Sequence, residues 1–238
     1  MSRKSIQYIC ADDGLELVLF HDEPRTYPWH FHARHWTLGL VRAGSVTVTT
    51  LTGSFSLSPG ETFSIPPLAP HRLDIEGQSS LAVLCVIDPL AHGGMFFTTA
   101  QGCESPDLIS WLENPFAEPT LAVEELPVEE ASPLGAVRRL LISQPDDHFP
   151  LKILARFAGF SPSYFLRAFK KETGLTPHAF QLICRVSRAR ELLRTGAAAA
   201  EAAASSGFTD QSHLHKVFKR HHGLTPGQFD TASFRPKR

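Results

Sequence analysis

Gly207-Phe208-Thr209-Asp210-Gln211-Ser212-His213-Leu214 belongs to the second of two matching stretches that decide the fold of this 238-residue chain. Each copy contains a Gly-Phe pair, a Phe-Lys pair, a Gly-Leu-Thr-Pro turn and a final Phe, which begin at residues 159, 169, 174 and 180 and again at residues 207, 218, 223 and 229. The offset between the copies is 48 residues at the Gly-Phe pair and 49 from the Phe-Lys pair onward. We therefore expect one extra residue inside the second helix of the second copy.

Each copy predicts two helices joined by a tight turn. A glycine, Gly159 or Gly207, ends the first helix because it adopts a left-handed conformation easily. A hydroxyl residue then caps the second helix, and these caps are predicted at Ser161 and at Thr209, which precedes Asp210. Each second helix has an apolar stripe opposite a basic face. Two helices joined in this way form a helix-turn-helix, so the chain is predicted to contain two of them.

Residues 177–195 predict a single helix between the two copies, about 28 Å long. A rod of that length would hold the two second helices about one DNA turn apart, roughly 34 Å, so that both enter successive major grooves. A helix over residues 133–143, which begins at Ser132-Pro133, is expected to complete the first core. The second copy has Ala199 and Ala202 where the first has Leu151 and Leu154, which predicts a thinner second core.

The charge of the chain is divided between its two parts. Residues 1–132 contain six Lys and Arg against 17 Asp and Glu, a balance of −11, whereas residues 133–238 contain 17 against seven, a balance of +10. A basic domain attracts the phosphates of nucleic acids, so this division favours nucleic-acid binding by the second part.

The doubled pattern over residues 133–230 resembles the DNA-binding module of the AraC/XylS family of transcription regulators. The resemblance implies a regulator that binds double-stranded promoter DNA as a homodimer. The lack of a membrane span and of a signal-peptide core predicts a cytoplasmic protein, and an enzyme is not expected. It also implies a contact with RNA polymerase if the protein is an activator. The surface of the two second helices is expected to bind DNA through Ser163, Leu166, Arg167, Lys170, Lys171, Gln211, Ser212, His213, His215, Lys216 and Lys219.

Within that set, particular contacts can be predicted from chemistry. Arg167 is suited to guanine because a guanidinium can bond O6 and N7 together, and Gln211 is suited to adenine. Lys216 is suited to guanine or phosphate. Lys170, Lys171 and Lys219 are expected to contact phosphates without reading bases.

The first 90 residues predict short strands separated by Gly and Pro turns, as in a sandwich or a small barrel. His30-Phe31-His32, Ser58-Pro59-Gly60-Glu61 and the segment from Ile65 to His71 resemble the cupin barrel, which many AraC-type regulators use as an effector domain. The predicted fold class is therefore α+β and multidomain, a cupin-like β-barrel followed by an all-α double helix-turn-helix. The predicted domains are 1–100, a helical and acidic connector at 101–132, and 133–238.

Histidines of the cupin-like domain allow two interpretations. The first is a pocket for an organic effector, with contacts from His30, His32, Trp36 and His71. The second is a metal-responsive regulator that binds nickel, zinc, copper or iron through His30, His32, His71 and also His35 if a bulge turns it inward. The Glu that metal-binding cupins place four or five residues after the second His is replaced here by Trp36 and Thr37, which makes a cupin enzyme the least favoured alternative.

The remaining features bound the class of protein. The four cysteines, Cys10, Cys85, Cys103 and Cys184, have no metal-ligand spacing and predict free thiols in a reducing compartment. No apolar run is long enough for a membrane span. Within the connector, a short helix is predicted over residues 105–114.

Overall fold

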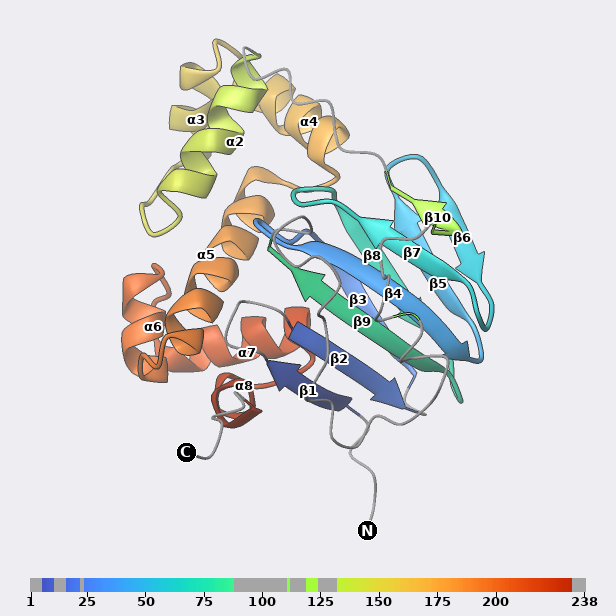
Figure 1. Cartoon of the computed structure of the whole chain (residues 1–238). Coiled ribbons are helices and arrows are strands. Elements are labelled where there is room, and N and C mark those ends of the chain that lie inside the picture. The colour runs from blue at the N-terminus through green and yellow to red at the C-terminus, as the bar shows by residue number, and fades with distance from the viewer. Residues whose placement is uncertain are drawn as a thin grey trace. The chain divides into compact units, whose positions relative to one another are not determined.

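The computed structural model describes residues 6–10, 16–21, 24–87, 111, 119–123 and 132–232. They divide into a strand-rich unit and a helical unit, and residues 27–33 group with the helical unit. Figure 1 shows both units with their elements labelled. The predicted α+β multidomain class is confirmed, since strands occupy the first part of the chain and helices the second. The predicted helix over residues 105–114 lies almost entirely outside the described residues, as does most of the acidic connector.

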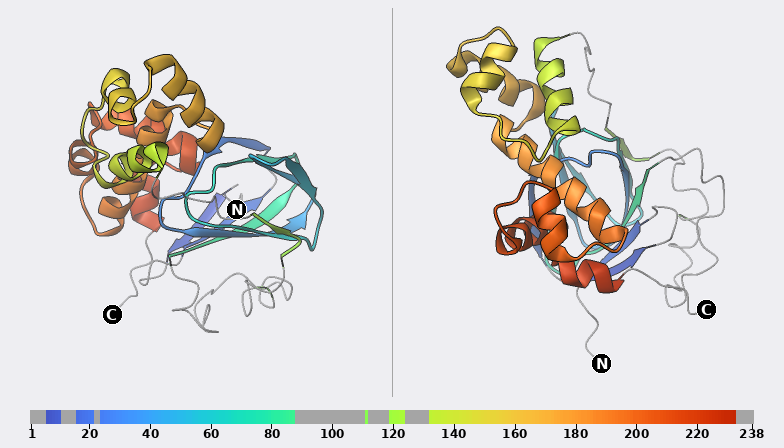
Figure 2. Two further views of the ribbon diagram at one scale, coloured as in Figure 1. Left: turned by 90° about the horizontal axis from the view of Figure 1, so that it is seen from above. Right: turned by 90° about the vertical axis from the view of Figure 1, so that its left-hand side faces the viewer.

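The strands form two sheets, which lie face to face (Figures 1 and 2). The larger sheet has the strand order β1-β2-β9-β4-β7-β10, in which the strands are Ile6–Cys10, Glu16–His21, Ser80–Val86, Trp36–Ala43, Thr62–Ile65 and Leu121–Ala122. The smaller sheet has the order β3-β8-β5-β6, in which the strands are Arg25–His30, His71–Ile75, Val46–Thr50 and Ser54–Leu57. The strand-like runs of the sequence lie at residues 15–20, 37–41, 45–51, 55–57, 62–65 and 81–87. Strands β2, β4, β5, β6, β7 and β9 occupy these positions, whereas β1, β3, β8 and β10 were not predicted.

Alternation of side chains in β5 shows how the sheets form a core. Val46 and Val48 are fully buried, whereas Thr47 and Thr49 are partly exposed and their hydroxyls lie 3.2 and 3.1 Å from the hydroxyls of serines on β6. This is the period-two pattern of a strand with one face on the core. Strands β4 and β9 are buried over most of their length, as expected for central strands of the larger sheet.

A glycine in the centre of β4 is required by the packing of an aromatic ring. A Cβ added to Gly39 would lie 2.1 Å from the ring of Phe63, which is itself 1% exposed on the neighbouring strand β7. The missing side chain therefore makes the room for Phe63 in the core.

Seven helices are described between residues 132 and 232: α2 (Pro133–Ser143), α3 (Leu151–Phe157), α4 (Pro162–Thr173), α5 (Pro177–Arg194), α6 (Ala199–Ser205), α7 (Gln211–His222) and α8 (Pro226–Ala232). Figure 2 shows α5 running between the cluster of α2, α3 and α4 and the cluster of α6, α7 and α8. The predicted rod is thus confirmed as one helix of 18 residues, about 27 Å long. No helix in the described part of the chain is long and apolar enough to cross a membrane.

Aromatic residues form the cores of the two helix clusters. In the first, Phe169 packs between Phe165 and Phe180, with ring centroids 5.6 and 5.5 Å apart. In the second, Phe218 packs on Phe229 at 5.5 Å. These residues are the repeated phenylalanines of the sequence pattern together with Phe165, and all five are at most 1% exposed.

Candidate nucleic-acid interface and histidine site

The first candidate recognition helix, α4, begins at a serine cap and ends at a glycine. The hydroxyl of Ser161 accepts a hydrogen bond from the backbone N–H of Tyr164, and Pro162 occupies the first helical position. Gly174 has a φ of 70°, the left-handed conformation in which a helix commonly ends. Both ends therefore lie where the sequence predicts them, which fixes the face that the helix presents.

The exposed face of α4 carries the predicted DNA contacts. Phe165, Phe169 and Thr173 are buried, and the opposite side exposes Ser163, Arg167, Lys170 and Lys171, with Leu166 half-buried beside them. Lys170 and Lys171 lie in the last turn, where cations interact favourably with the helix dipole. This face can offer a guanidinium fork to a base edge and ammonium groups to phosphates.

The second candidate helix, α7, begins one residue later than predicted. Its cap is Asp210 rather than Thr209, and the Asp210 carboxylate accepts the backbone N–H of His213 at 2.7 Å. This hydrogen bond is the main reason that the pKa of Asp210 is lowered. Thr209 instead donates its hydroxyl hydrogen to the Asp210 carboxylate at 3.3 Å.

This cap also corrects the predicted position of the extra residue. Helices α4 and α7 both contain 12 residues, so neither is longer than the other. The caps Ser161 and Asp210 are already 49 residues apart, whereas Gly159 and Gly207 are 48 apart. The extra residue therefore lies in the turn between Gly207 and Asp210, and the prediction that it lies inside the helix was wrong.

The exposed face of α7 carries most of the predicted contacts of the second copy. Leu214 and Phe218 are buried, and the outward side exposes Gln211, Ser212, His215, Lys216 and Lys219.

His213 differs from the other residues predicted on this face. It is half-buried, its ring packs on Phe208 at 5.3 Å, and its Nδ1 lies 3.2 Å from the Thr209 hydroxyl. These contacts turn His213 toward the turn of its own helix-turn-helix.

Three histidines of the smaller sheet form the second candidate site. His30 ends β3, His71 begins the adjacent strand β8, and His32 follows β3 by two residues. Each offers one ring nitrogen, and these atoms lie within 4.8 Å of one another. The sequence predicted this grouping, but it did not predict the two adjacent strands that produce it.

Hydrogen bonds to the backbone orient two of these rings. Nδ1 of His30 donates to the carbonyl oxygen of Pro28 at 2.7 Å, and Nδ1 of His71 donates to that of Ala69 at 3.0 Å. A carbonyl oxygen can only accept, so Nδ1 carries the hydrogen and Nε2 of the neutral ring carries the lone pair. This is the arrangement in which histidines usually bind metals.

Burial favours the neutral form of His30. Desolvation lowers the pKa of His30 to about 4, so at neutral pH its ring is uncharged. His71 is fully buried and His32 is half-buried. Imidazole nitrogens are donors suited to nickel, copper, zinc or iron, so the residues present fit a transition metal.

The other predicted residues of this site lie close by in sequence but outside the group of three. His35 is buried, at 5% exposure, in the segment between β3 and β4. Trp36 is the half-buried first residue of β4, where it pairs with Val86 of β9. Tyr27, whose ring lies 6.2 Å from that of His30, was not predicted, because regular alternation along a strand places residues three apart on opposite faces.

The two cysteines whose side chains are described are free thiols, as predicted. Cys85 and Cys184 are buried, and desolvation raises the pKa of each to about 12. Neither is therefore a thiolate near neutral pH, which leaves them as packing residues.

Residues 154–232 match a family of helix-turn-helix domains, and residues 18–87 match the cupin domain family. The chain joins a cupin domain to an AraC-type helix-turn-helix domain. Strands β3 to β9 and most of β2 fall in the first match, and α4 to α8 fall in the second.

Two relatives and one solved structure extend this result. HTH-type transcriptional regulator MtrA of Neisseria gonorrhoeae is 34% identical over 97 residues, 40% of this chain and 32% of MtrA. RCS-specific HTH-type transcriptional activator RclR of Escherichia coli is 24% identical over 233 residues, 78% of this chain and 81% of RclR. The crystal structure of ToxT from Vibrio cholerae shares the fold, with a TM-score of 0.57 and 12% identity over 97% of this chain and 98% of that one.

Proposed function

We propose that this cupin and AraC-type chain is a transcription regulator, not an enzyme, which binds promoter DNA and is controlled by a small molecule bound in the cupin domain. One observation carries the DNA-binding part. Helices α4 and α7 have the same length, a polar cap at the start, a left-handed glycine at the end, and cations on the side opposite the buried phenylalanines. Each is preceded by a shorter helix, α3 or α6, and is therefore the second helix of its pair, which is the recognition helix of a helix-turn-helix.

The exposed residues divide into two roles. Arg167 on α4 and Gln211 on α7 present side chains that can bond two atoms of one base, guanine and adenine respectively. Lys170, Lys171 and Lys219 lie in the last turns of these helices and are suited to phosphates. The N-terminal residues Ser163, Leu166 and Ser212, together with His215 and Lys216, complete the proposed contact surface, and His213 supports the turn before α7.

The effector would bind among His30, His32, His71 and Trp36, which supply polar and stacking groups. Binding to a palindromic promoter would require a homodimer, and activation would require a contact with RNA polymerase. Promoter binding would place the protein in the cytoplasm.

The full chain should bind fragments of the promoters that genome-wide mapping of bound sites identifies. If α4 and α7 together neutralise about six phosphates, the affinity should fall about 10³-fold between 50 and 200 mM salt, because binding releases condensed cations. Fluorescence anisotropy of labelled fragments measures this. A random fragment of equal length is the control, and it should bind more weakly with a similar salt dependence. No salt-dependent affinity for any mapped fragment would overturn the proposed function.

A metal-responsive regulator is the second candidate, because three histidines converge within 4.8 Å with two of their rings oriented by the backbone. His30, His32 and His71 would hold the ion, and the metal would supply a fixed link among the segments that carry them. The organic effector remains the first candidate, because the Glu found in metal-binding cupins is replaced here.

Metal binding separates these two candidates. In the metal-responsive case, the full chain should bind one nickel, zinc, copper or iron ion, and His71→Ala should lower its affinity at least tenfold, because a buried ligand is lost. Isothermal titration and metal analysis give the affinity and stoichiometry. His178→Ala, which removes an exposed histidine of α5, is the matched control and should retain the ion. Equal binding by the His71→Ala variant and the control would exclude this metal site.

A further inference from the structure

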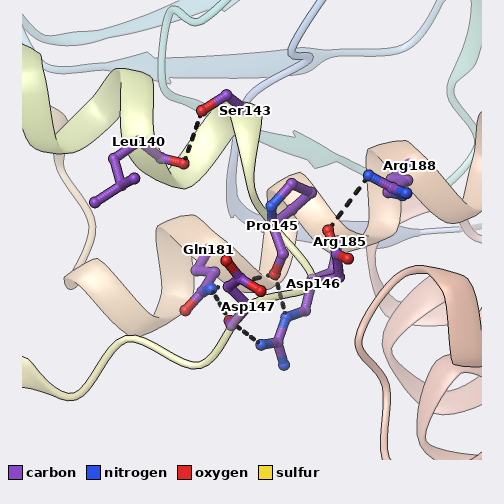
Figure 3. A network of polar contacts seen from close by, with 8 residues as sticks. All are labelled: Leu140, Ser143, Pro145, Asp146, Asp147, Gln181, Arg185 and Arg188. Carbon is purple, nitrogen blue, oxygen red and sulfur yellow. Dashed lines mark hydrogen bonds and ion pairs between the residues drawn. The ribbon is translucent and has the colours of Figure 1, made fainter.

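Three residues of the loop between α2 and α3, Pro145–Asp147, are held against α5 by side-chain donors. The Nε and Nη2 atoms of Arg185 donate to the carbonyl oxygens of Pro145 at 2.7 Å and of Asp147 at 2.9 Å. The side-chain amide of Gln181 donates to the same two oxygens, at 3.1 and 2.7 Å. Figure 3 shows both side chains pointing at this stretch of backbone.

The spacing of the donors makes this a rigid contact. Gln181 and Arg185 are four residues apart on α5, so they lie on one face of that helix. Gln181 is 7% exposed, and removing a donor from a buried carbonyl oxygen costs the desolvation of that group. Arg185 is half-buried, and this desolvation lowers the pKa of its guanidinium.

The same loop touches the turn of the second helix-turn-helix. A Cβ added to Gly207 would lie 2.7 Å from the Cα and 2.8 Å from the carbonyl oxygen of Asp146, and 3.1 Å from Nε of Arg185. Gly207 also has a φ of 77°. The equivalent glycine of the first copy, Gly159, has a φ of 72° but nothing within 4 Å of such a Cβ. Of the two turns, only the one at Gly207 therefore packs against this loop.

We propose that Pro145–Asp147, Gln181, Arg185 and Gly207 form an inter-subdomain clamp that sets the orientation of α4 relative to α7. The loop belongs to the first helix cluster, Gly207 precedes α7 of the second, and Arg185 of the connecting helix contacts the first and lies beside the second. Gln181, Arg185 and Gly207 are positioning residues, because they fix the spacing at which the two recognition helices meet successive grooves. This inference rests on the proposed DNA-binding function.

Arg188 provides a natural control within the same network. Its guanidinium lies 3.3 Å from the carboxylate of Asp146, but both side chains are more than 40% exposed. Exposed ion pairs of this kind contribute little. Arg188→Ala and Arg185→Ala each remove one positive charge from α5, so a comparison of the two cancels the general loss of attraction to phosphate.

Two DNA fragments distinguish the clamp from an ordinary contact. One carries the full site and the other only the half read by α4. Arg185→Ala in the full chain should lower the affinity for the full site about tenfold relative to Arg188→Ala, because binding must then order the two helix clusters. It should leave the half-site affinity equal to that of the control. The variant should also tolerate an insertion of one base pair between the halves better than the wild type. Equal losses on both fragments would overturn the clamp.

Distance measurements in the free protein test the clamp without DNA. Spin labels at Lys171→Cys and Arg220→Cys, with Cys10→Ser and Cys103→Ser, report the separation of α4 and α7. The distance between the labels should have a narrow distribution in the wild type, in Arg188→Ala and in Gly159→Ala. It should have a broad distribution in Arg185→Ala and in Gly207→Ala. If Arg185→Ala does not fold, Arg185→Lys replaces it, because lysine cannot serve both carbonyls with a planar fork. Unchanged widths contradict the clamp, whereas absent DNA binding by the wild type contradicts the proposed function alone.

Discussion

Replacing Phe169 with Ala should lower the free energy of unfolding of the helical unit by about 3–5 kcal/mol, the usual cost of removing a phenyl ring from a packed core. The Phe169 ring is fully buried and lies between Phe165 and Phe180, so its loss leaves a cavity at the contact of α4 with α5. Folded domains are commonly stable by about 5–15 kcal/mol, so this loss is a large share of the total.

Two optical probes separate the units in this experiment. All seven described helices lie between residues 133 and 232, so circular dichroism at 222 nm follows mainly the helical unit. Of the three tryptophans, Trp36 and Trp111 belong to the strand-rich unit, whereas Trp29 groups with the helical unit. With Trp29→Phe introduced in every variant, the remaining fluorescence reports on the strand-rich unit. Phe169→Ala should shift the urea midpoint of the first signal and leave the second nearly unchanged.

Phe157→Ala is the matched control because it removes the same ring from the neighbouring helix α3, where Phe157 is 59% exposed. Surface substitutions of this kind usually change stability by less than about 0.5 kcal/mol. Equal effects of the two variants would mean that Phe169 is not a core residue of the helical unit.

The helical unit was predictable because its signals are local. Caps, glycines and the period of apolar residues place Ser132, Ser161, Gly174 and Gly223 at helix ends from the sequence alone, and the structure has them there. The cap at Asp210 was missed because Thr209 and Asp210 are both good caps and one residue separates them. Only backbone geometry decides between two such neighbours.

The prediction of a thinner second core was partly wrong for a related reason. Leu151 was counted as a core residue of the first copy, at the position equivalent to Ala199 of the second, but Leu151 is 37% exposed. The difference that remains in the core is Leu154, at 2% exposure, against the fully buried Ala202. Apolar character alone did not show on which side of a short helix a residue lies.

The histidine site shows what non-local pairing adds. His30 and His71 are 41 residues apart in sequence, and they meet because β3 and β8 are adjacent in one sheet. Neither strand was predicted, since Pro28 interrupts β3 and three of the five residues of β8 are polar or charged, namely His71, Arg72 and Asp74. The grouping came from the cupin resemblance. The clamp could not be predicted at all, because its acceptors are backbone carbonyls, which carry no sequence signal.

Replacing Arg167 with Ala should relax the sequence preference of the protein at one base pair and lower the affinity for the preferred site by about 1–3 kcal/mol, about 5–150-fold. Arg167 is exposed on α4 opposite the buried Phe165 and Phe169, in the first half of the helix, which is the half that usually enters the major groove. Arg167→Lys should recover the phosphate attraction but not the preference, because an ammonium group cannot bond O6 and N7 of guanine as a planar fork does.

Lys171→Ala separates base reading from general attraction, because Lys171 lies one turn further along α4 and carries the same charge. Its loss should weaken binding to all sequences alike and reduce the salt dependence by about one phosphate contact. Selection from a randomised fragment library, followed by sequencing, shows the difference directly. Arg167→Ala should flatten the preference at one position of the site, and Lys171→Ala should leave every position as in the wild type. If both variants keep the wild-type preference, α4 does not read bases through Arg167, and its exposed cations only hold the duplex.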